Sequence, residues 1–194
     1  MKYTVSILLF SVFLFSSVLS NAQEDAGLTE KQQRKADKEK AKEEKEAKEA
    51  AEWLAFQKLA NDQTFVVQFE KMTNPRTGKV YIVSRRLNFL YANGEEVKVQ
   101  FETTTSASEN GLGGRTISGT ISNYKYKKPK NNNKPIYINF DITTKFNQQN
   151  FNITVTVYSG GIALVSFGGG TSDINGTFTA IENASINMGA DMRN

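Results

Sequence analysis

The sequence predicts a mainly β protein, in which an antiparallel meander forms a sandwich or a barrel and one long charged α-helix precedes it. Three observations lead to this fold class. Residues 29–60 consist almost entirely of strong helix formers, apolar and polar residues alternate from Gln63 onward, and turns rich in glycine and asparagine separate the alternating segments. Each strand is therefore expected to bury one face and to expose the other.

The predicted helix changes character along its length. Thr29 and Gln32 form a capping-box pattern, and the first two-thirds has no stripe of large apolar residues, so it is predicted to be a solvated or partly disordered arm. The lack of a heptad pattern argues against a coiled coil. Trp53, Phe56 and Ala60 share one face, which predicts that the end of the helix docks on the β domain. An aromatic platform for a sugar or peptide is the alternative.

The segments that alternate with a period of two predict a series of strands. Predicted strands cover residues 63–72, 79–84, 86–92, 95–105, 115–127, 135–146, 151–158, 162–167 and 172–181. The residues expected to face inward include Phe65, Val67, Phe69, Ile136, Ile138, Phe140, Ile142, Phe151, Ile153, Val155 and Val157. On the strand that contains Val97, Val99 and Phe101, the opposite face is predicted to be solvated and consists of Glu96, Lys98, Gln100 and Glu102.

Three loops predict how neighbouring strands pair. Each loop is expected to bring apolar residues together across the hairpin. The predicted pairs are Phe89 with Val97 across residues 92–94, Ile142 with Val155 across residues 147–150, and Val157 with Ala163 across residues 159–161.

The N-terminal segment predicts export. Residues 1–22 read as a signal peptide, with Lys2 as the positive region and cleavage before Gln23, and an uncleaved anchor is the alternative. The chain has no cysteine, so a lipoprotein is not expected and the predicted location is periplasmic or secreted. The mature chain is then expected to comprise a charged arm at 23–50, a docking helix end at 51–62, an antiparallel β domain at 63–181 and a C-terminal tail at 182–194.

The missing residue types exclude several kinds of chemistry. The chain has no histidine and no cysteine, so it cannot form a Ser-His-Asp or Cys-His relay or a conventional zinc site. No catalytic residue, metal ligand or cofactor is predicted, and the residues of a binding site stay unknown. A pair of carboxylates on facing strands could still support hydrolysis. The glycine-rich segment 110–114 leads into a predicted strand, which favours a turn over a phosphate-binding loop.

Positive charge is concentrated in the β domain. The chain has 24 basic and 20 acidic residues, and the excess of basic residues lies after Asn61. Five lysines fall between Lys125 and Lys134, where they form either a solvated loop or a patch for an anionic surface such as lipid headgroups or acidic polysaccharide. Nucleic acid is not expected as a partner of an exported protein, and no transmembrane span is expected in the mature chain.

Several strand and turn segments are similar to those of a known family. They are Leu87-Asn88-Phe89-Leu90 before Asn93-Gly94, residues 97–101, residues 110–114, and residues 117–124. Together with the order of signal peptide, charged helix and β domain, they make residues 40–181 resemble the domain of unknown function 4251 family, which comprises exported proteins of Bacteroidetes-type bacteria. The resemblance implies an envelope location and this layout, and it supplies no activity, cofactor or catalytic residue.

The sequence thus predicts an exported, non-catalytic β domain that binds an envelope component or a small ligand. Two alternatives remain open: a structural or interaction protein that acts through the charged helix, and a hydrolase based on carboxylates. A concave pocket lined by inward strand faces would favour binding of a small ligand.

Overall fold

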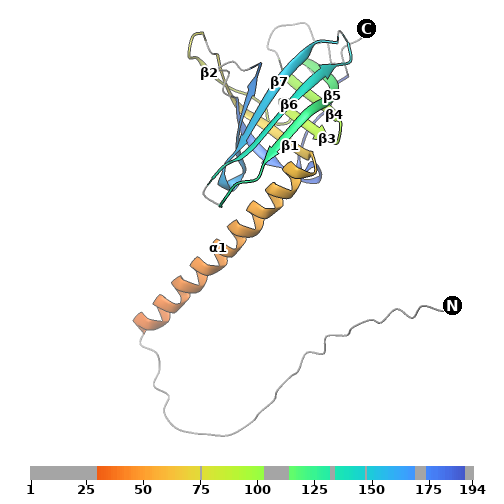
Figure 1. Ribbon diagram of the computed structural model, residues 1–194. Coiled ribbons are helices and arrows are strands. Elements are labelled where there is room, and N and C mark those ends of the chain that lie inside the picture. The colour runs from red at the N-terminus through yellow and green to blue at the C-terminus, as the bar shows by residue number, and fades with distance from the viewer. Residues whose placement is uncertain are drawn as a thin grey trace, which may run out of the picture. The chain divides into compact units, whose positions relative to one another are not determined.

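The computed structural model describes residues 30–74, 76–102, 114–131, 134–146, 148–168 and 174–190 (Figure 1). The predicted signal peptide, Thr29 and residues 110–113 of the glycine-rich segment lie outside these ranges. In chain order, the elements are α1 (Glu30–Asn61), β1 (Thr64–Thr73), β2 (Val80–Ile82), β3 (Phe89–Asn93), β4 (Glu96–Glu102), β5 (Gly114–Lys127), β6 (Ile136–Thr144), β7 (Asn150–Val157), the 3₁₀ turn η1 (Ser159–Gly161), β8 (Ile162–Phe167), β9 (Ile174–Thr179) and the 3₁₀ turn η2 (Ile181–Asn183).

Eight of the described strands close into an antiparallel barrel. Neighbours along the chain pair from β3 to β9, and β1 closes the circle by pairing with β3 on one side and β9 on the other. The short strand β2 pairs with the end of β1 and stands outside the circle. The mainly β fold is therefore confirmed, and of the two predicted architectures the barrel is correct.

The seam between β1 and β9 depends on a glycine. Gly176 lies opposite Phe69, next to a register shift in β1. A Cβ atom at position 176 would lie 2.3 Å from the carbonyl oxygen of Gln68, a distance that no side chain tolerates without movement of the backbone. The absence of a side chain lets the two strands approach closely enough to close the barrel.

The inward faces of the strands form the core. Alternation predicted this core correctly, because the apolar residues of β1, β6 and β7 that were expected to face inward are buried, apart from the half-buried Phe151. The largest fully buried side chains of the cluster are Phe65, Phe69, Phe140, Phe178, Leu90, Ile136, Ile138 and Ile153.

The end of α1 packs on the barrel. Trp53, Phe56 and Ala60 are buried, and residues 41–61 belong to the same compact unit as the strands. The Phe56 ring meets the ring of Phe178 edge-on at 5.6 Å, and the Tyr124 hydroxyl donates a hydrogen bond to the carbonyl of Ala60. This apolar contact closes one end of the barrel interior.

The preceding part of α1 is a solvated helix. Residues 30–52 are exposed except for the half-buried Ala50. Ion pairs with i,i+4 spacing join Lys42 to Glu46 at 3.7 Å and Lys45 to Glu49 at 3.8 Å. Exposed pairs of this kind contribute only about 0.3–0.5 kcal/mol each, so the strong helix propensity of the residues carries most of the local stability.

One of the three predicted hairpin registers is confirmed. Across η1, Val157 lies opposite Ala163 and Val155 opposite Val165, as predicted. The predicted pairing of Ile142 with Val155 is wrong, because Ile142 lies opposite Phe151. The backbone N–H of Thr144 donates a hydrogen bond of 2.9 Å to the carbonyl of Gln149, so β6 ends before the predicted loop at residues 147–150 begins.

The predicted pairing of Phe89 with Val97 is also wrong. Ala92 lies opposite Val97 and Phe89 opposite Gln100, so the turn consists of Gly94 and Glu95, with Gly94 at a φ of 61°. The prediction assumed that apolar residues lie opposite one another across the hairpin. Phe89 is fully buried, but it belongs to the outer face of the sheet.

Residues 184–190, here called the C-terminal strap, cover this part of the outer face. The Gln100 amide donates hydrogen bonds to the carbonyls of Leu87 and Asn187, and its carbonyl oxygen accepts from the Thr116 hydroxyl and from the backbone N–H of Gly189. Gln100 is therefore fully buried, which corrects its predicted place on a solvated face.

Candidate ligand-binding site

The barrel contains an apolar pocket at the end where β1 finishes. Its volume is about 460 Å³, and it is partly open to solvent. Because neighbouring strands run in opposite directions, this end gathers the last residues of β1, β4, β6 and β8 and the first residues of β5, β7 and β9. The described residues that line it are Met72, Thr73, Asn74, Tyr81, Val99, Phe101, Ile117, Ile142, Phe151, Ile153, Phe167 and Ile174.

Pairs of residues on neighbouring strands build the wall of the pocket. Residues that lie opposite each other in an antiparallel pair point to the same face of the sheet. An inward-facing apolar residue on one strand therefore has an inward-facing partner on the next strand. The lining pairs are Val99 with Ile117, Ile142 with Phe151, Ile153 with Phe167, and Met72 with Ile174.

An aromatic stack links the pocket to the core. Phe69 is fully buried and stacks on Phe101 at a ring distance of 5.7 Å, and Phe101 meets Phe167 edge-on at 5.6 Å. Phe101 and Phe167 are only half-buried. The packed core therefore gives way to open apolar surface along this stack.

Eight strands make this arrangement possible. A barrel of this size has an interior just wide enough to be filled by its own side chains or to hold one small ligand. Near α1, the rings of Phe65 and Phe178 stack at 4.9 Å and fill the interior. Toward the pocket, aliphatic side chains such as Val99 and Ile117 line the wall and leave the space described above.

The polar groups of the pocket lie in the β1–β2 segment. Tyr81 supplies a hydroxyl group, whereas the side-chain oxygen of Asn74 already accepts hydrogen bonds from the backbone N–H groups of Arg76 and Thr77, at 3.0 and 3.2 Å. Thr73 borders the pocket, but it lies opposite Val80, so its side chain belongs to the other face of the strand pair. The lining residues that the structure describes include no charged side chain. The site can hold an apolar body and contact a polar group near its rim.

The clearest pKa shifts among the described residues occur away from the pocket lining. Hydrogen bonds from Asn152 and Asn123, both of 2.8 Å, hold the pKa of Asp141 below its usual value on the outer face of the barrel. Burial raises the pKa of Tyr124, and the nearby Tyr126 adds to the rise. These shifts follow from structural hydrogen bonds and packing.

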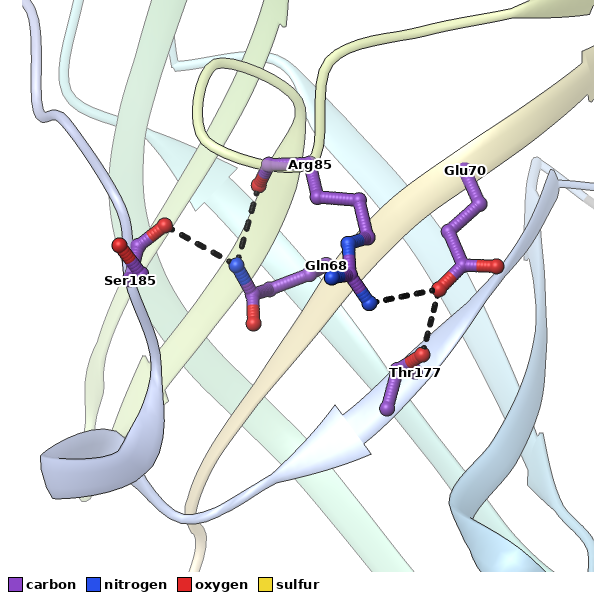
Figure 2. A network of polar contacts seen from close by, with 5 residues as sticks. All are labelled: Gln68, Glu70, Arg85, Thr177 and Ser185. Carbon is purple, nitrogen blue, oxygen red and sulfur yellow. Dashed lines mark hydrogen bonds and ion pairs between the residues drawn. The ribbon is translucent and has the colours of Figure 1, made fainter.

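A second hollow, polar in character, is lined by residues of β1, β9, the segment after β2 and the C-terminal strap. Figure 2 shows the polar contacts at this place, where Glu70 accepts hydrogen bonds from the Thr177 hydroxyl at 2.7 Å and from Arg85 at 3.2 Å. The Gln68 amide donates to the carbonyls of Arg85 and Ser185. The bond from Gln68 to Ser185 fastens the strap to β1, and the bonds of Glu70 join β1 to β9 and to Arg85.

The basic segment lies at the end of β5 and in the loop that follows. Its five lysines, from Lys125 to Lys134, are exposed, and residues 132–133 lie outside the described ranges. Glu95 and Glu96 are adjacent in the sequence, and Glu96 forms an ion pair of 3.4 Å with Lys98.

The residues described contain neither a candidate metal-binding group nor a candidate membrane-spanning helix. Within those ranges, no group of three or more acidic, histidine or cysteine residues could hold a metal ion. No helix there is long and apolar enough to cross a membrane.

Sequence reasoning identified part of the pocket wall but did not detect the cavity. Val99, Phe101, Ile142, Phe151 and Ile153 were all predicted to face inward, and they do. Met72 was missed because the register shift between Phe69 and Lys71 moves the inward position in β1 from odd to even residues. Tyr81 was missed because the short strand β2 shows little alternation. A useful signal would have been the clustering of apolar residues at those strand ends that meet at one rim.

The family model described as domain of unknown function (DUF4251) matches residues 38–168. A crystal structure of a DUF4251 family protein from Bacteroides eggerthii is similar, with 22% sequence identity, coverage of 67% of this chain and 91% of that chain, and a TM-score of 0.48. No curated protein gives a significant match. The match to the family model covers well over half of the chain, so this protein belongs to the DUF4251 family.

Proposed function

We propose that this protein is an exported, non-catalytic binding protein that holds an apolar small molecule in the open end of its barrel. The observation that carries the proposal is the apolar pocket of about 460 Å³. Small-molecule sites occupy about 300–1,000 Å³, are lined mainly by apolar and aromatic side chains, and carry few polar groups. The pocket has this size and composition.

The mouth of the barrel favours an elongated ligand with one polar end. The walls formed by Ile142, Phe151 and Ile153 offer only apolar contact, whereas the hydroxyl group of Tyr81 belongs to the β1–β2 side. A molecule with an acyl or alkyl chain would bury the chain in the barrel and turn its polar end toward this hydroxyl. Burial of the chain would supply most of the binding free energy, at about 0.8 kcal/mol per methylene group.

The lining favours binding over catalysis. General acid–base chemistry requires a titratable group within hydrogen-bond reach of the reacting atoms. The described lining residues contribute aliphatic and aromatic side chains, the hydroxyl of Tyr81 and one amide that is engaged in a turn, and they include no carboxylate and no lysine. A site of this kind recognises its ligand by shape and apolar contact.

The export signal supports a site of action in the cell envelope. The pattern of residues 1–22 and the absence of cysteine favour a periplasmic or secreted protein that carries no lipid anchor. Fractionation of the native bacterium, followed by N-terminal sequencing, tests this location. A mature N-terminus at Gln23 in the periplasmic or culture fraction would support it, and an intact N-terminus in the cytoplasm would contradict it.

A fluorescent probe tests the pocket directly. N-phenyl-1-naphthylamine is uncharged and becomes fluorescent in apolar surroundings, so it should bind and should be displaced by 1-decanol. Phe151→Asp places a charge in the wall, and the cost of desolvating this charge should weaken probe binding by about tenfold or more. Phe146→Asp is the matched control, because Phe146 is 47% exposed and lies outside the pocket lining.

The two variants separate the possible results. Loss of probe binding in Phe151→Asp, with normal binding in Phe146→Asp and an unchanged circular dichroism spectrum in both, would support the pocket as the site. Equal binding by all three proteins, or no binding by the unmodified protein, would refute the proposal.

A further inference from the structure

The end of β1 and strand β2 form a hairpin that rises beside the pocket. We refer to residues 71–74 and 76–83 as the β1–β2 hairpin. Within the described part of the chain, β2 pairs with β1 and with no other strand. Two backbone hydrogen bonds join the strand ends at the turn: Gly78 N–H donates to the Asn74 carbonyl and Asn74 N–H to the Lys79 carbonyl, both at 2.9 Å. Figure 1 shows this hairpin projecting from the barrel wall.

The two faces of the hairpin differ in what they contact. Met72 lies opposite Tyr81, and both line the pocket. In β2, Val80 and Ile82 flank Tyr81 and therefore lie on the other face of the hairpin, where they pair with Thr73 and Lys71. Ile82 is 85% exposed and Val80 is 54% exposed, so two β-branched apolar side chains are presented to solvent beside the rim of an apolar pocket.

The charged residues of the hairpin itself are all positive. Lys71, Arg76 and Lys79 are exposed, and the segment from residue 71 to residue 86 contains no acidic residue. Lys79 lies over the ring of Tyr81 at 5.1 Å, which keeps its charge close to the apolar tip. Apolar side chains next to cations fit the interface of an anionic bilayer, where the former enter the acyl boundary and the latter meet the headgroups.

We propose that the β1–β2 hairpin binds the surface of an anionic phospholipid membrane and brings the pocket mouth to that surface. The proposed membrane contact is inferred from the residues of the hairpin alone. If the pocket also binds an amphiphile, as proposed above, this contact would let the amphiphile pass from the bilayer into the barrel, and this second step rests on the proposed function. A protein strand that adds to the edge of β2 fits less well, because β2 is three residues long and offers few backbone groups for pairing.

Vesicle co-sedimentation tests the membrane contact. The protein should begin at Gln23, so that the predicted signal peptide cannot contribute to binding. It should sediment with vesicles of phosphatidylglycerol and much less with phosphatidylcholine, and added salt should release it. The double variants Arg76→Glu/Lys79→Glu and Val80→Ser/Ile82→Ser should each reduce the bound fraction on phosphatidylglycerol by about tenfold, since charge and apolar insertion both contribute.

The basic segment at the end of β5 supplies a matched control. Lys127→Glu/Lys128→Glu makes the same change in net charge on exposed lysines elsewhere on the barrel, and it should change binding by less than about twofold because these lysines lie outside the proposed contact. An equal or larger loss in this control would overturn the proposal in favour of the lysine loop. Absence of vesicle binding, or equal binding to both lipids, would also overturn it. So would a vesicle-free dimer that Val80→Ser/Ile82→Ser dissociates, since the hairpin would then bind a second copy.

The pocket and the hairpin can fail independently. Phe151→Asp should lose the fluorescent probe and still sediment with anionic vesicles. The hairpin variants should bind the probe from solution with unchanged affinity, yet take it up more slowly when it is preloaded into phosphatidylglycerol vesicles. Uptake from vesicles at an unchanged rate would overturn the delivery role of the hairpin and would leave the pocket assignment intact.

Discussion

Gln68 and Gln100 make matching hydrogen bonds on the outer face of the barrel. Each side-chain amide donates to one carbonyl of residues 85–87 and to one carbonyl of the C-terminal strap, at distances between 2.9 and 3.2 Å. Both glutamines lie opposite Phe89 in their strand pairs. The two amides therefore fasten the strap over this aromatic ring and keep it from solvent.

Replacing these glutamines should destabilise the protein to different extents. Gln100→Ala removes four hydrogen bonds of a fully buried side chain and should lower the free energy of unfolding by about 3 kcal/mol. Gln68→Ala loses two bonds at a less buried site and should cost about 1–2 kcal/mol. Urea denaturation measures both values. Gln57→Ala, on the half-exposed side of α1, is the control, and equal losses in all three variants would contradict this role of the glutamines.

The contact between α1 and the barrel can be tested through the single tryptophan. Phe56 packs edge-on against both Trp53 and Phe178, so Phe56→Ala should cost about 3 kcal/mol and shift the Trp53 emission to longer wavelength as water enters. Leu54 lies on the same helix but is 62% exposed, and Leu54→Ala should leave stability and emission nearly unchanged. A similar small effect of both variants would show that the helix end does not dock as described.

Closure of the barrel should depend on Gly176. In Gly176→Ala, the new methyl group would meet the carbonyl oxygen of Gln68 in β1, so the seam between β1 and β9 would have to open. The expected loss is about 1–3 kcal/mol, with faster amide exchange along the β1–β9 pairs. Thr179→Ala, on the half-exposed face of the same strand, is the control for a change of residue in β9. Unchanged exchange at the seam in Gly176→Ala would contradict the close approach.

Stability should fall at alkaline pH, in part because of Tyr124. Burial raises the pKa of this hydroxyl in the folded protein, so the unfolded chain loses the proton first, near its usual pKa of about 10. The stabilisation is complete below pH 10 and is lost as the pH rises through the folded-state pKa. Tyr124→Phe should cost about 1 kcal/mol at pH 7 through loss of the bond to Ala60, and this difference should shrink above pH 10. Parallel pH profiles for the two proteins would contradict this assignment.

The local pattern of the sequence correctly predicted which faces of the helix and of several strands are buried. Alternation gave the buried faces of β1, β6 and β7, and the spacing of Trp53, Phe56 and Ala60 gave the buried face of α1. These predictions succeeded because a side chain's direction follows from the helical or extended geometry of the few residues around it.

Burial of a strand face by a segment that is distant in the sequence could not be predicted in this way. Phe89 and Gln100 are buried by a segment that lies about 90 residues further along the chain, and no local pattern indicates such cover. The pocket was missed for a related reason. Its walls consist of ordinary inward-facing residues, and the space between them depends on how eight strands close, which is a property of the whole barrel.

Methyl NMR of isoleucine-labelled protein tests the central claim most directly. Ile117, Ile142, Ile153 and Ile174 line the pocket, whereas Ile121, Ile136 and Ile138 belong to the core outside it. Titration with 1-decanol should shift the first four methyl signals in a saturable manner and leave the last three nearly unmoved. Shifts confined to the core set, or spread evenly over both sets, would show that the open end of the barrel is not a ligand-binding site.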